Sequence, residues 1–408
     1  MATVLGFWFD YSCPYAFLAS KRLAAIERDH DVRISYRPML LGGVFRARDV
    51  PQNLAGTLGA AKTRHLGNDL ARWSELLGTS LQMPSGHPFR TVEALRATLA
   101  TGCDPQVIHG FYQAYWQEGR PPSDPATLRG VLGGAGYDVP QILSMMSTDA
   151  IREDLRTRTD RAVSLGIFGA PVWETPEGAL YWGQDRIDFA LRAMRGSEAP
   201  GPARTQAPTN ETSMTRKLEF YWDFSSPYAY LGAAQAEAFA ARTGAELVHR
   251  PMLLGAIFKA VGQVQIPMAT FSDAKKAYVL RDIHDWASYL GVPFTFNTTF
   301  PLNSIKALRV YLALPPERQA AFREATFRAA WAENRDINDE AVLRSLIGED
   351  AEAVLAKTND PAVKQALFAA TDRAVAAGVF GAPTWVIDEK ELFFGQDRLP
   401  LVEQALRR

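Results

Sequence analysis

The chain has 408 residues, which is enough for two or three hydrophobic cores, and two domains are expected. Apolar residues make up 47% of it, and 44 Lys and Arg residues nearly balance 45 Asp and Glu residues. Without a charge excess to attract nucleic acid or anionic lipid, a small-molecule partner is expected. The sequence has no apolar run of about 18 residues and no secretory signal at its start, which predicts no membrane association and a cytoplasmic location.

A sequence repeat organises the chain. Arg-Pro-Met-Leu-Leu-Gly occurs at residues 37–42 and again at 250–255, an offset of 213 (250 − 37). Three further segments match at an offset of 213 or 212: residues 9–16 with 222–229, 168–171 with 380–383, and 183–186 with 395–398. We interpret the two halves as copies of one domain.

The predicted elements follow the same order in both copies. An apolar strand leads through Ser-Cys-Pro or Ser-Ser-Pro into a helix, a second strand and a long helical stretch, and then a strand that begins with proline, another strand and a last helix. This order predicts an α/β fold made of two tandem thioredoxin-like domains, each with an inserted all-helical subdomain. The predicted bounds are 1–195 and 216–408 for the domains, about 55–160 and 270–372 for the insertions, and 196–215 for a linker rich in Pro, Ala and Thr.

The strongest candidate for chemistry is the residue before the proline that opens the first helix. A proline at the first helical position leaves backbone N–H groups unpaired, so this helix end carries partial positive charge and favours a thiolate. Cys13 occupies the position in the first copy, where its thiol pKa is expected to fall, and Ser226 occupies it in the second, where it is expected to donate a hydrogen bond to a thiolate on a ligand. The alternatives are a simple N-cap for Ser226 and a small buried hydrophobic residue for Cys13.

The second repeated position is Ala-Pro before a β-prone run, at Ala170-Pro171 and Ala382-Pro383. A cis proline there would offer the preceding residue's N–H and C=O to a peptide-like ligand. A trans proline that merely begins an edge strand is the alternative. The pairing with the Ser/Cys-Pro helix start favours the cis form.

Polar and aromatic residues also recur. Gln184-Asp185 and Gln396-Asp397 are expected to open the last helix, where the aspartate either caps the helix or meets a ligand ammonium group. Lys62 and Lys275 are either surface charges or contacts for a ligand carboxylate, and Tyr15 and Tyr228 are either core or pocket residues. The tryptophans Trp73, Trp116, Trp286 and Trp331 are expected to pack or to form pocket walls in the insertions.

Metal and disulfide sites are not predicted. None of the six histidines recurs at a matching position in the other copy, which argues against a shared histidine base or a histidine-ligated metal. Cys13 and Cys103 stand in different sequence contexts, so they provide neither a disulfide framework nor a four-thiolate site.

These motifs together resemble the branch of the DsbA-like thioredoxin superfamily that holds 2-hydroxychromene-2-carboxylate isomerases and kappa-class glutathione transferases. The resemblance covers nearly all of both halves and rests on segments 223–228, 378–383 and 395–398. It implies that glutathione is the cofactor and that Ser226 holds its sulfur. It also implies further cofactor contacts in the second half, at Lys275, Asn303, Ala382, Pro383, Gln396 and Asp397.

The first half departs from the family pattern. Cys13 stands where the pattern has serine, and Arg90-Thr91 replaces the Asn303-Ser304 of the second half. The matching cofactor positions in the first half are Lys62, Ala170, Pro171, Gln184 and Asp185.

The resemblance implies a glutathione-dependent cis-trans isomerase that acts on aromatic or conjugated carbonyl compounds by reversible thiolate addition. It also implies an intramolecular pseudo-dimer. The alternatives are a kappa-like glutathione transferase, a thiol-disulfide oxidoreductase centred on Cys13, and a non-catalytic tandem binding protein. The oxidoreductase would normally need a second cysteine where Ala16 stands.

Overall fold

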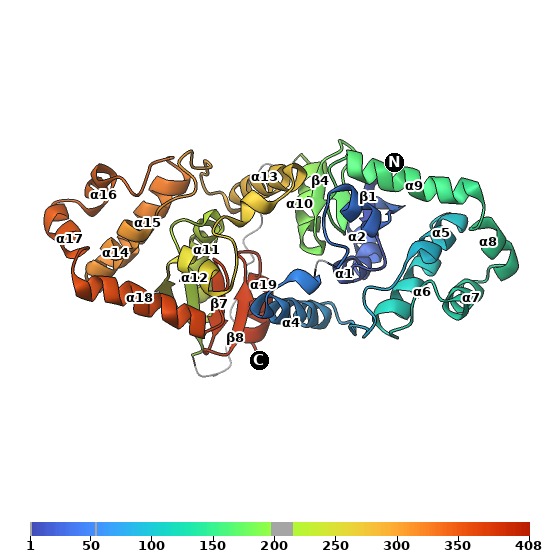
Figure 1. Cartoon of the computed structure of the whole chain (residues 1–408), viewed down its shortest axis with the longest axis horizontal. Helices are drawn as coiled ribbons and strands as arrows, with labels where there is room; N and C mark the ends of the chain where they lie inside the picture. Colours follow the sequence, from blue (N-terminus) through green and yellow to red (C-terminus); the bar gives the residue numbers. More distant parts are fainter. Residues whose placement is uncertain (1, 54, 197–214) are drawn as a thin grey trace. The chain divides into compact units, whose positions relative to one another are not determined.

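The computed structural model describes residues 2–53, 55–196 and 215–408 (Figure 1). Apart from its two end residues, the predicted linker at 196–215 lies outside this part of the chain. The described residues form two compact units: unit 1 takes in those of 2–58, 67–196 and 272–275, and unit 2 those of 59–66, 215–271 and 276–408.

Unit 1 contains a four-stranded mixed sheet in the order β2-β1-β3-β4. β1 pairs with β2 in parallel and with β3 antiparallel, and Phe7 lies opposite Trp173. β1 is buried from Leu5 onward, because elements cover both faces of this central strand. The strands are β1 (Thr3–Phe9), β2 (Val32–Pro38), β3 (Val172–Glu174) and β4 (Leu180–Trp182).

Helices fill the rest of the first repeat, and the segment between β2 and β3 is helical throughout its regular elements. Figure 1 shows that α9 runs from the far end of this insertion back to the sheet. The helices are α1 (Pro14–Ser20), α2 (Leu23–His30), α3 (Leu41–Ala47), α4 (Ala60–Leu76), α5 (Val92–Ala100), α6 (Pro105–Trp116), α7 (Pro125–Gly134), α8 (Val139–Met145), α9 (Asp149–Ser164) and α10 (Ile187–Met194), with short 3-10 turns η1 (Ala55–Thr57) and η2 (Gln184–Arg186).

Unit 2 repeats the sheet in the order β6-β5-β7-β8. β5 pairs in parallel with β6, as β1 does with β2. It pairs antiparallel with β7, so that Phe220 lies opposite Trp385. The strands are β5 (Lys217–Trp222), β6 (Glu246–Pro251), β7 (Thr384–Ile387) and β8 (Glu391–Phe394).

The helices of the second repeat also follow the first, with one difference. A single helix, α11, replaces α1 and α2 and ends at Gly244, whose positive φ of 68° suits glycine. The elements are α11 (Pro227–Thr243), α12 (Leu254–Ala260), α13 (Asp273–Leu290), α14 (Ile305–Ala313), α15 (Pro316–Trp331), α16 (Glu340–Ile347), α17 (Ala351–Lys357), α18 (Pro361–Ala376) and α19 (Leu399–Leu406), with η3 (Pro267–Thr270).

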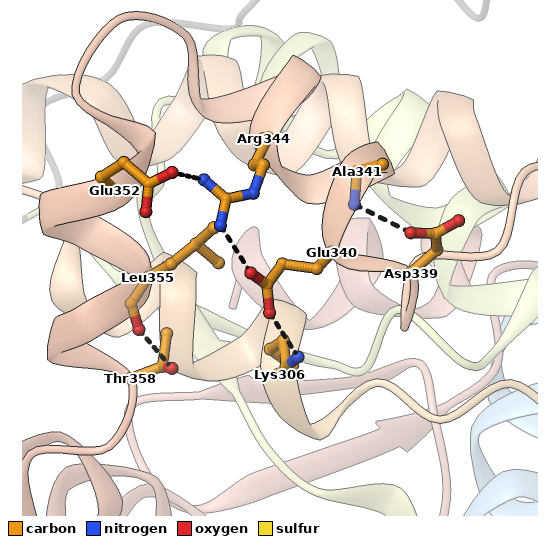
Figure 2. Close-up of polar contacts among 8 residues, drawn as sticks. All are labelled: Lys306, Asp339, Glu340, Ala341, Arg344, Glu352, Leu355 and Thr358. Atoms are coloured by element: carbon orange, nitrogen blue, oxygen red, sulfur yellow. Dashed lines mark hydrogen bonds and ion pairs between the residues drawn. The ribbon is translucent and has the colours of Figure 1, made fainter.

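Exposed ion pairs join the outer helices α16 and α17 of the second insertion, and a side-chain cap begins α16 (Figure 2). Arg344 of α16 pairs with Glu340 over 2.6 Å and with Glu352 of α17. Asp339 caps α16 by accepting a hydrogen bond from the Ala341 N–H over 2.8 Å. These contacts lie in the helical insertion and not on the sheet.

The predicted fold class is confirmed. Both copies form a mixed sheet with an all-helical insertion between the second and third strands. Within the described part of the chain, no helix is long and apolar enough to cross a membrane.

Candidate active site

Ser226 lies at the N-terminus of α11, directly after the turn that follows β5. Pro227 takes the first helical position, and Ser226 keeps an extended backbone with φ −102° and ψ 117°. Its hydroxyl oxygen accepts a hydrogen bond from the Ala229 N–H over 3.1 Å and donates one to the carbonyl oxygen of Ala382 over 3.2 Å. The N-cap interpretation of Ser226 is therefore correct, and the same hydroxyl also faces the second repeated motif.

Cys13 takes the same place at the start of α1, with φ −97° and ψ 116°. Its thiol donates a hydrogen bond to the carbonyl oxygen of Ala170 over 3.0 Å and does not cap the helix. Both repeats therefore bring the residue before the helix proline against the residue before the strand proline.

The expectation that the thiol pKa of Cys13 falls is wrong. Burial raises the pKa of this thiol to about 12, because an 8%-exposed side chain has little water to solvate a thiolate. Backbone hydrogen bonds at Ala16 and Tyr15 lower the pKa, and the negative charge of Asp10 raises it further, but burial outweighs both. Cys13 is therefore a neutral thiol in this structure.

A buried aspartate fixes each of these turns. Asp223 accepts hydrogen bonds from the Ser225 N–H over 2.9 Å and from the Leu254 N–H over 2.7 Å. Asp10 makes the equivalent contacts with Ser12 and Leu41. Each carboxylate thus joins the turn before the site residue to the start of the helix after the second strand.

Burial raises the pKa of Asp10 and of Asp223, although hydrogen bonds to each carboxylate act in the opposite direction. Neither aspartate was among the predicted site residues. Their recurrence three positions before Cys13 and before Ser226 was the available signal.

The Ala170-Pro171 and Ala382-Pro383 peptide bonds are both cis, as predicted. Two further X-Pro bonds, His87-Pro88 and Phe300-Pro301, are also cis and were not predicted. The amide N–H groups of Ala170 and Ala382 donate to no backbone carbonyl in the described part of the chain outside helices and strands.

The Gln-Asp motif lies before the last helix and does not open it. Arg186 and Arg398 take the N-cap positions of α10 and α19, and neither arginine side chain caps its helix. Asp185 pairs with Arg186 over 3.2 Å, and Asp397 with Arg398 over 2.9 Å. Neither aspartate therefore occupies the N-cap position itself.

The glutamines of this motif are buried without full hydrogen bonding. Gln184 is 1% exposed, and neither its amide nitrogen nor its amide oxygen has a partner among the described residues. Gln396 is 3% exposed, and its amide nitrogen likewise has no acceptor there. A buried amide group without a partner costs free energy, so both glutamines are suited to a polar ligand.

In each motif, the glycine before the glutamine leaves room for the aspartate side chain to fold back against the backbone. Gly183 and Gly395 have φ values of 116° and 115°, which side chains rarely adopt. A Cβ atom at either position would lie 2.6 Å from a carboxylate oxygen of Asp185 or Asp397. Only glycine therefore allows the aspartate to fold back in this way.

The remaining predicted cofactor residues lie on helices or at their ends. Lys62 is on α4, where burial lowers its pKa. Lys275 is on α13 in the segment grouped with unit 1, and its ammonium lies 5.8 Å from the centre of the Trp182 ring. Asn303 is exposed, and its side-chain oxygen accepts a hydrogen bond from the Ile305 N–H over 3.2 Å.

The predicted pocket tyrosines lie one residue after the helix proline. The Tyr15 hydroxyl donates a hydrogen bond to Asp69 over 2.8 Å, and Asp69 is only 1% exposed. Asp69 was missed because 54 residues separate it from Tyr15, and Asp282 is the matching residue of the second copy. Tyr15 and Tyr228 are half-buried, so neither is a fully buried core residue.

Two of the repeated tryptophans pack beneath the site. Trp116 and Trp331 are fully buried, and their indole N–H groups donate to the carbonyl oxygens of Tyr11 and Phe224 over 2.8 Å. Each therefore ties the insertion to the turn before Cys13 or Ser226. In the described residues, no group of three or more His, Cys, Asp or Glu side chains is placed to hold a metal ion.

Comparison with known proteins identifies the family of the chain. The DSBA-like thioredoxin domain matches residues 4–195 and again 217–407. A 2-hydroxychromene-2-carboxylate isomerase of Sphingobium xenophagum is 31% identical over 196 residues, which are 47% of this chain and 99% of that protein.

More distant relatives carry two different names. The 2-hydroxychromene-2-carboxylate isomerase of Pseudomonas putida is 26% identical, over 47% of this chain and 94% of that protein. The glutathione S-transferase kappa 1 of Homo sapiens is 28% identical, over 47% of this chain and 92% of that protein. The chain therefore belongs to the DSBA-like thioredoxin family, in the branch of the 2-hydroxychromene-2-carboxylate isomerases and kappa-class glutathione transferases, with the domain present twice.

Proposed function

We propose that the chain is a glutathione-dependent cis-trans isomerase of aromatic or conjugated carbonyl compounds, with its chemistry at Ser226. One observation carries the proposal: the Ser226 hydroxyl lies at a helix N-terminus and contacts the carbonyl oxygen of Ala382, 156 residues away. The names of the isomerase relatives support this reaction, and the serine of the second domain favours that domain over the first.

The residues around Ser226 suit glutathione. The buried Gln396 amide nitrogen lacks an acceptor, and Asp397 provides a negative charge for the γ-glutamyl ammonium group. The backbone of Ala382 offers a carbonyl oxygen, and its amide N–H, for a peptide-like ligand. Asn303 is a further binding residue that the family resemblance implies, whereas Lys275, which it also implies, is grouped with unit 1.

Glutathione would supply a thiol that adds reversibly to a carbon conjugated with the substrate carbonyl, which frees rotation about the former double bond. The protein's own residues orient and desolvate this thiol. The Ser226 hydroxyl proton, which now points to Ala382, would turn to the sulfur, and the N–H groups at the start of α11 would favour negative charge there. Asp223 holds the turn that positions Ser226.

Cys13 is poorly suited to redox chemistry. Its thiol is buried and its pKa is raised to about 12, whereas a reactive cysteine needs a lowered pKa and access to its partner. No second cysteine follows at the position of Ala16. These observations favour the isomerase over an oxidoreductase centred on Cys13.

The test is the isomerisation of 2-hydroxychromene-2-carboxylate, followed by absorbance with and without glutathione. We expect activity only with glutathione, a loss of about a hundredfold in Ser226→Ala, and retained activity in Cys13→Ala. Activity without glutathione, or undiminished activity in Ser226→Ala, would contradict the proposal. Conjugation of an aryl halide without isomerisation would favour the transferase, and loss of disulfide reduction in Cys13→Ala would favour the oxidoreductase.

A further inference from the structure

Unit 1 contains a cavity of about 540 Å³ between α3, α5 and α9. Its size lies in the range of sites for small organic molecules. Apolar side chains, among them Leu40, Val92, Leu155 and Val163, form part of its walls. The cavity lies wholly within one compact unit, since all of its lining residues belong to unit 1.

The charges around this cavity are strongly unbalanced. Four arginines line it, Arg46, Arg96, Arg152 and Arg156, against the single carboxylate of Asp160. A cavity with this excess of guanidinium groups favours an anion, and the planar fork of arginine matches the oxygens of a carboxylate or a phosphate.

The hydrogen bonding of these arginines leaves capacity for a ligand. The Nε atom of Arg96 is buried and has no acceptor among the described residues. Arg152 and Arg156 pair with Asp149 over 3.3 Å and with Glu153 over 2.7 Å, but these pairs are exposed on the helix surface. Such exposed pairs contribute little, so a bound anion competes with them easily.

The cavity lies apart from the candidate active site of the first domain. Neither Cys13 nor Ala170 lines it. Helix α9 covers the sheet face that carries Trp8, because Arg161 of α9 and the Trp8 indole both contact Glu174.

Helix α1, by contrast, lies on the opposite sheet face. Phe17 of α1 and Phe9 of β1 both contact the ring of Tyr112. Successive side chains of a strand point to opposite faces, so Phe9 and Trp8 lie on different sides of the sheet. Helices α9 and α1 therefore lie on opposite sides of the sheet, and the cavity is lined by residues of α9 but by none of α1.

We propose that this cavity is a second binding site, specific for a small organic anion with an apolar body and a carboxylate or phosphate group. Arg96 and Arg46 bind the anionic group, and the aliphatic walls pack against the body. The proposal does not depend on the proposed function at Ser226.

The second domain differs at the corresponding positions. Arg309 matches Arg96, and its Nε atom is also buried without an acceptor among the described residues. However, Phe368 replaces Arg156 and is 58% exposed. The full set of four arginines therefore belongs to the first domain.

Equilibrium dialysis of the whole protein tests this site with three probes that share a naphthyl body: 2-naphthoate, 2-naphthyl phosphate and the uncharged 2-naphthalenemethanol. We expect one saturable site for at least one anion, with the alcohol at least about tenfold weaker. The better anion identifies the preferred group. Equal binding of the alcohol, or no saturable binding of either anion, would overturn the proposal.

Variants locate the bound anion. Arg96→Gln and Arg46→Gln are each expected to weaken binding by about tenfold, whereas Arg129→Gln, at an exposed position on α7, leaves it unchanged. The exposed Arg46 keeps the test valid if Arg96→Gln does not fold. Binding must persist in Ser226→Ala and Cys13→Ala. Loss in those two variants, with no effect of Arg96→Gln or Arg46→Gln, would place the probe in the active sites and overturn the proposal.

Discussion

The Ser226 hydroxyl and the Ala382 carbonyl oxygen lie 3.2 Å apart and are joined by a hydrogen bond. Cys13 and Ala170 form the matching contact in the first domain, over 3.0 Å. The two sites differ in chemistry, because the serine hydroxyl also caps its helix and the cysteine thiol does not. Each domain thus presents a different hydrogen-bond donor at the same place.

Ser226→Ala is expected to weaken glutathione binding and to lower the free energy of unfolding by about 1 kcal/mol, because the cap of α11 is lost. Calorimetric titration and thermal unfolding measure the two effects. Asp339→Ala is the matched control, since it removes the cap of α16 in the helical insertion (Figure 2). It should cost a similar free energy without changing glutathione binding. Equal weakening of binding in both variants would show that Ser226 acts only through stability.

Cys13 is expected to react slowly with a thiol reagent in the folded protein. With its pKa raised to about 12, its thiolate fraction at pH 8 is about a thousandfold below that of an ordinary cysteine. The reaction rate of the Cys103→Ala variant should therefore rise steadily with pH up to about 12, and unfolding should abolish the protection. A rate that levels off near neutral pH would contradict the raised pKa.

Asp223 is expected to make stability depend on pH. Burial raises its pKa in the folded protein, so the folded state holds this proton more tightly than the unfolded chain. Its contribution to stability is therefore fully present below the unfolded pKa of about 3.9 and is lost as pH rises through the raised folded pKa.

Asp223→Asn should remove this pH dependence in unfolding measurements. It should also cost about 1–3 kcal/mol, because one of the two N–H donors loses its carboxylate acceptor. Asp10→Asn makes the same change in the first domain and separates the two contributions. An unchanged pH profile in both variants would contradict the assignment.

Gln396→Met is expected to separate stability from binding. The amide nitrogen of Gln396 is buried without an acceptor, so an apolar side chain of similar size should leave the unfolding free energy unchanged or raise it. Glutathione binding should weaken at the same time if Gln396 contacts the cofactor. Gln319→Met is the control, because the Gln319 amide already donates to the Leu314 carbonyl. Destabilisation without any change in binding would contradict the role of Gln396.

The fold was predictable because the sequence contains it twice. Each copy is predicted to open with an apolar strand, and β1 and β5 take these places. Ser226 and Ala382 both belong to repeated motifs that the sequence analysis singles out, whereas the hydrogen bond between them is a finding of the structure. Local patterns were sufficient for the strands and the motifs.

Other features depended on tertiary packing and could not be predicted. The thiol pKa of Cys13 was expected to fall because of the helix N-terminus, but burial reverses the direction. Asp69 meets Tyr15 from a distant helix, and Arg46 and Arg96 come from separate helices to one cavity. Neither this burial nor these long-range contacts produce a short-range pattern in the sequence.

The role of Ser226 in glutathione binding is tested most directly by a calorimetric titration of the reduced protein with glutathione, alongside Ser226→Ala and Cys13→Ala. This role of Ser226 predicts saturable binding that weakens at least about tenfold in Ser226→Ala and persists in Cys13→Ala. The absence of binding at millimolar glutathione, or equal binding in the wild type and in Ser226→Ala, would contradict it.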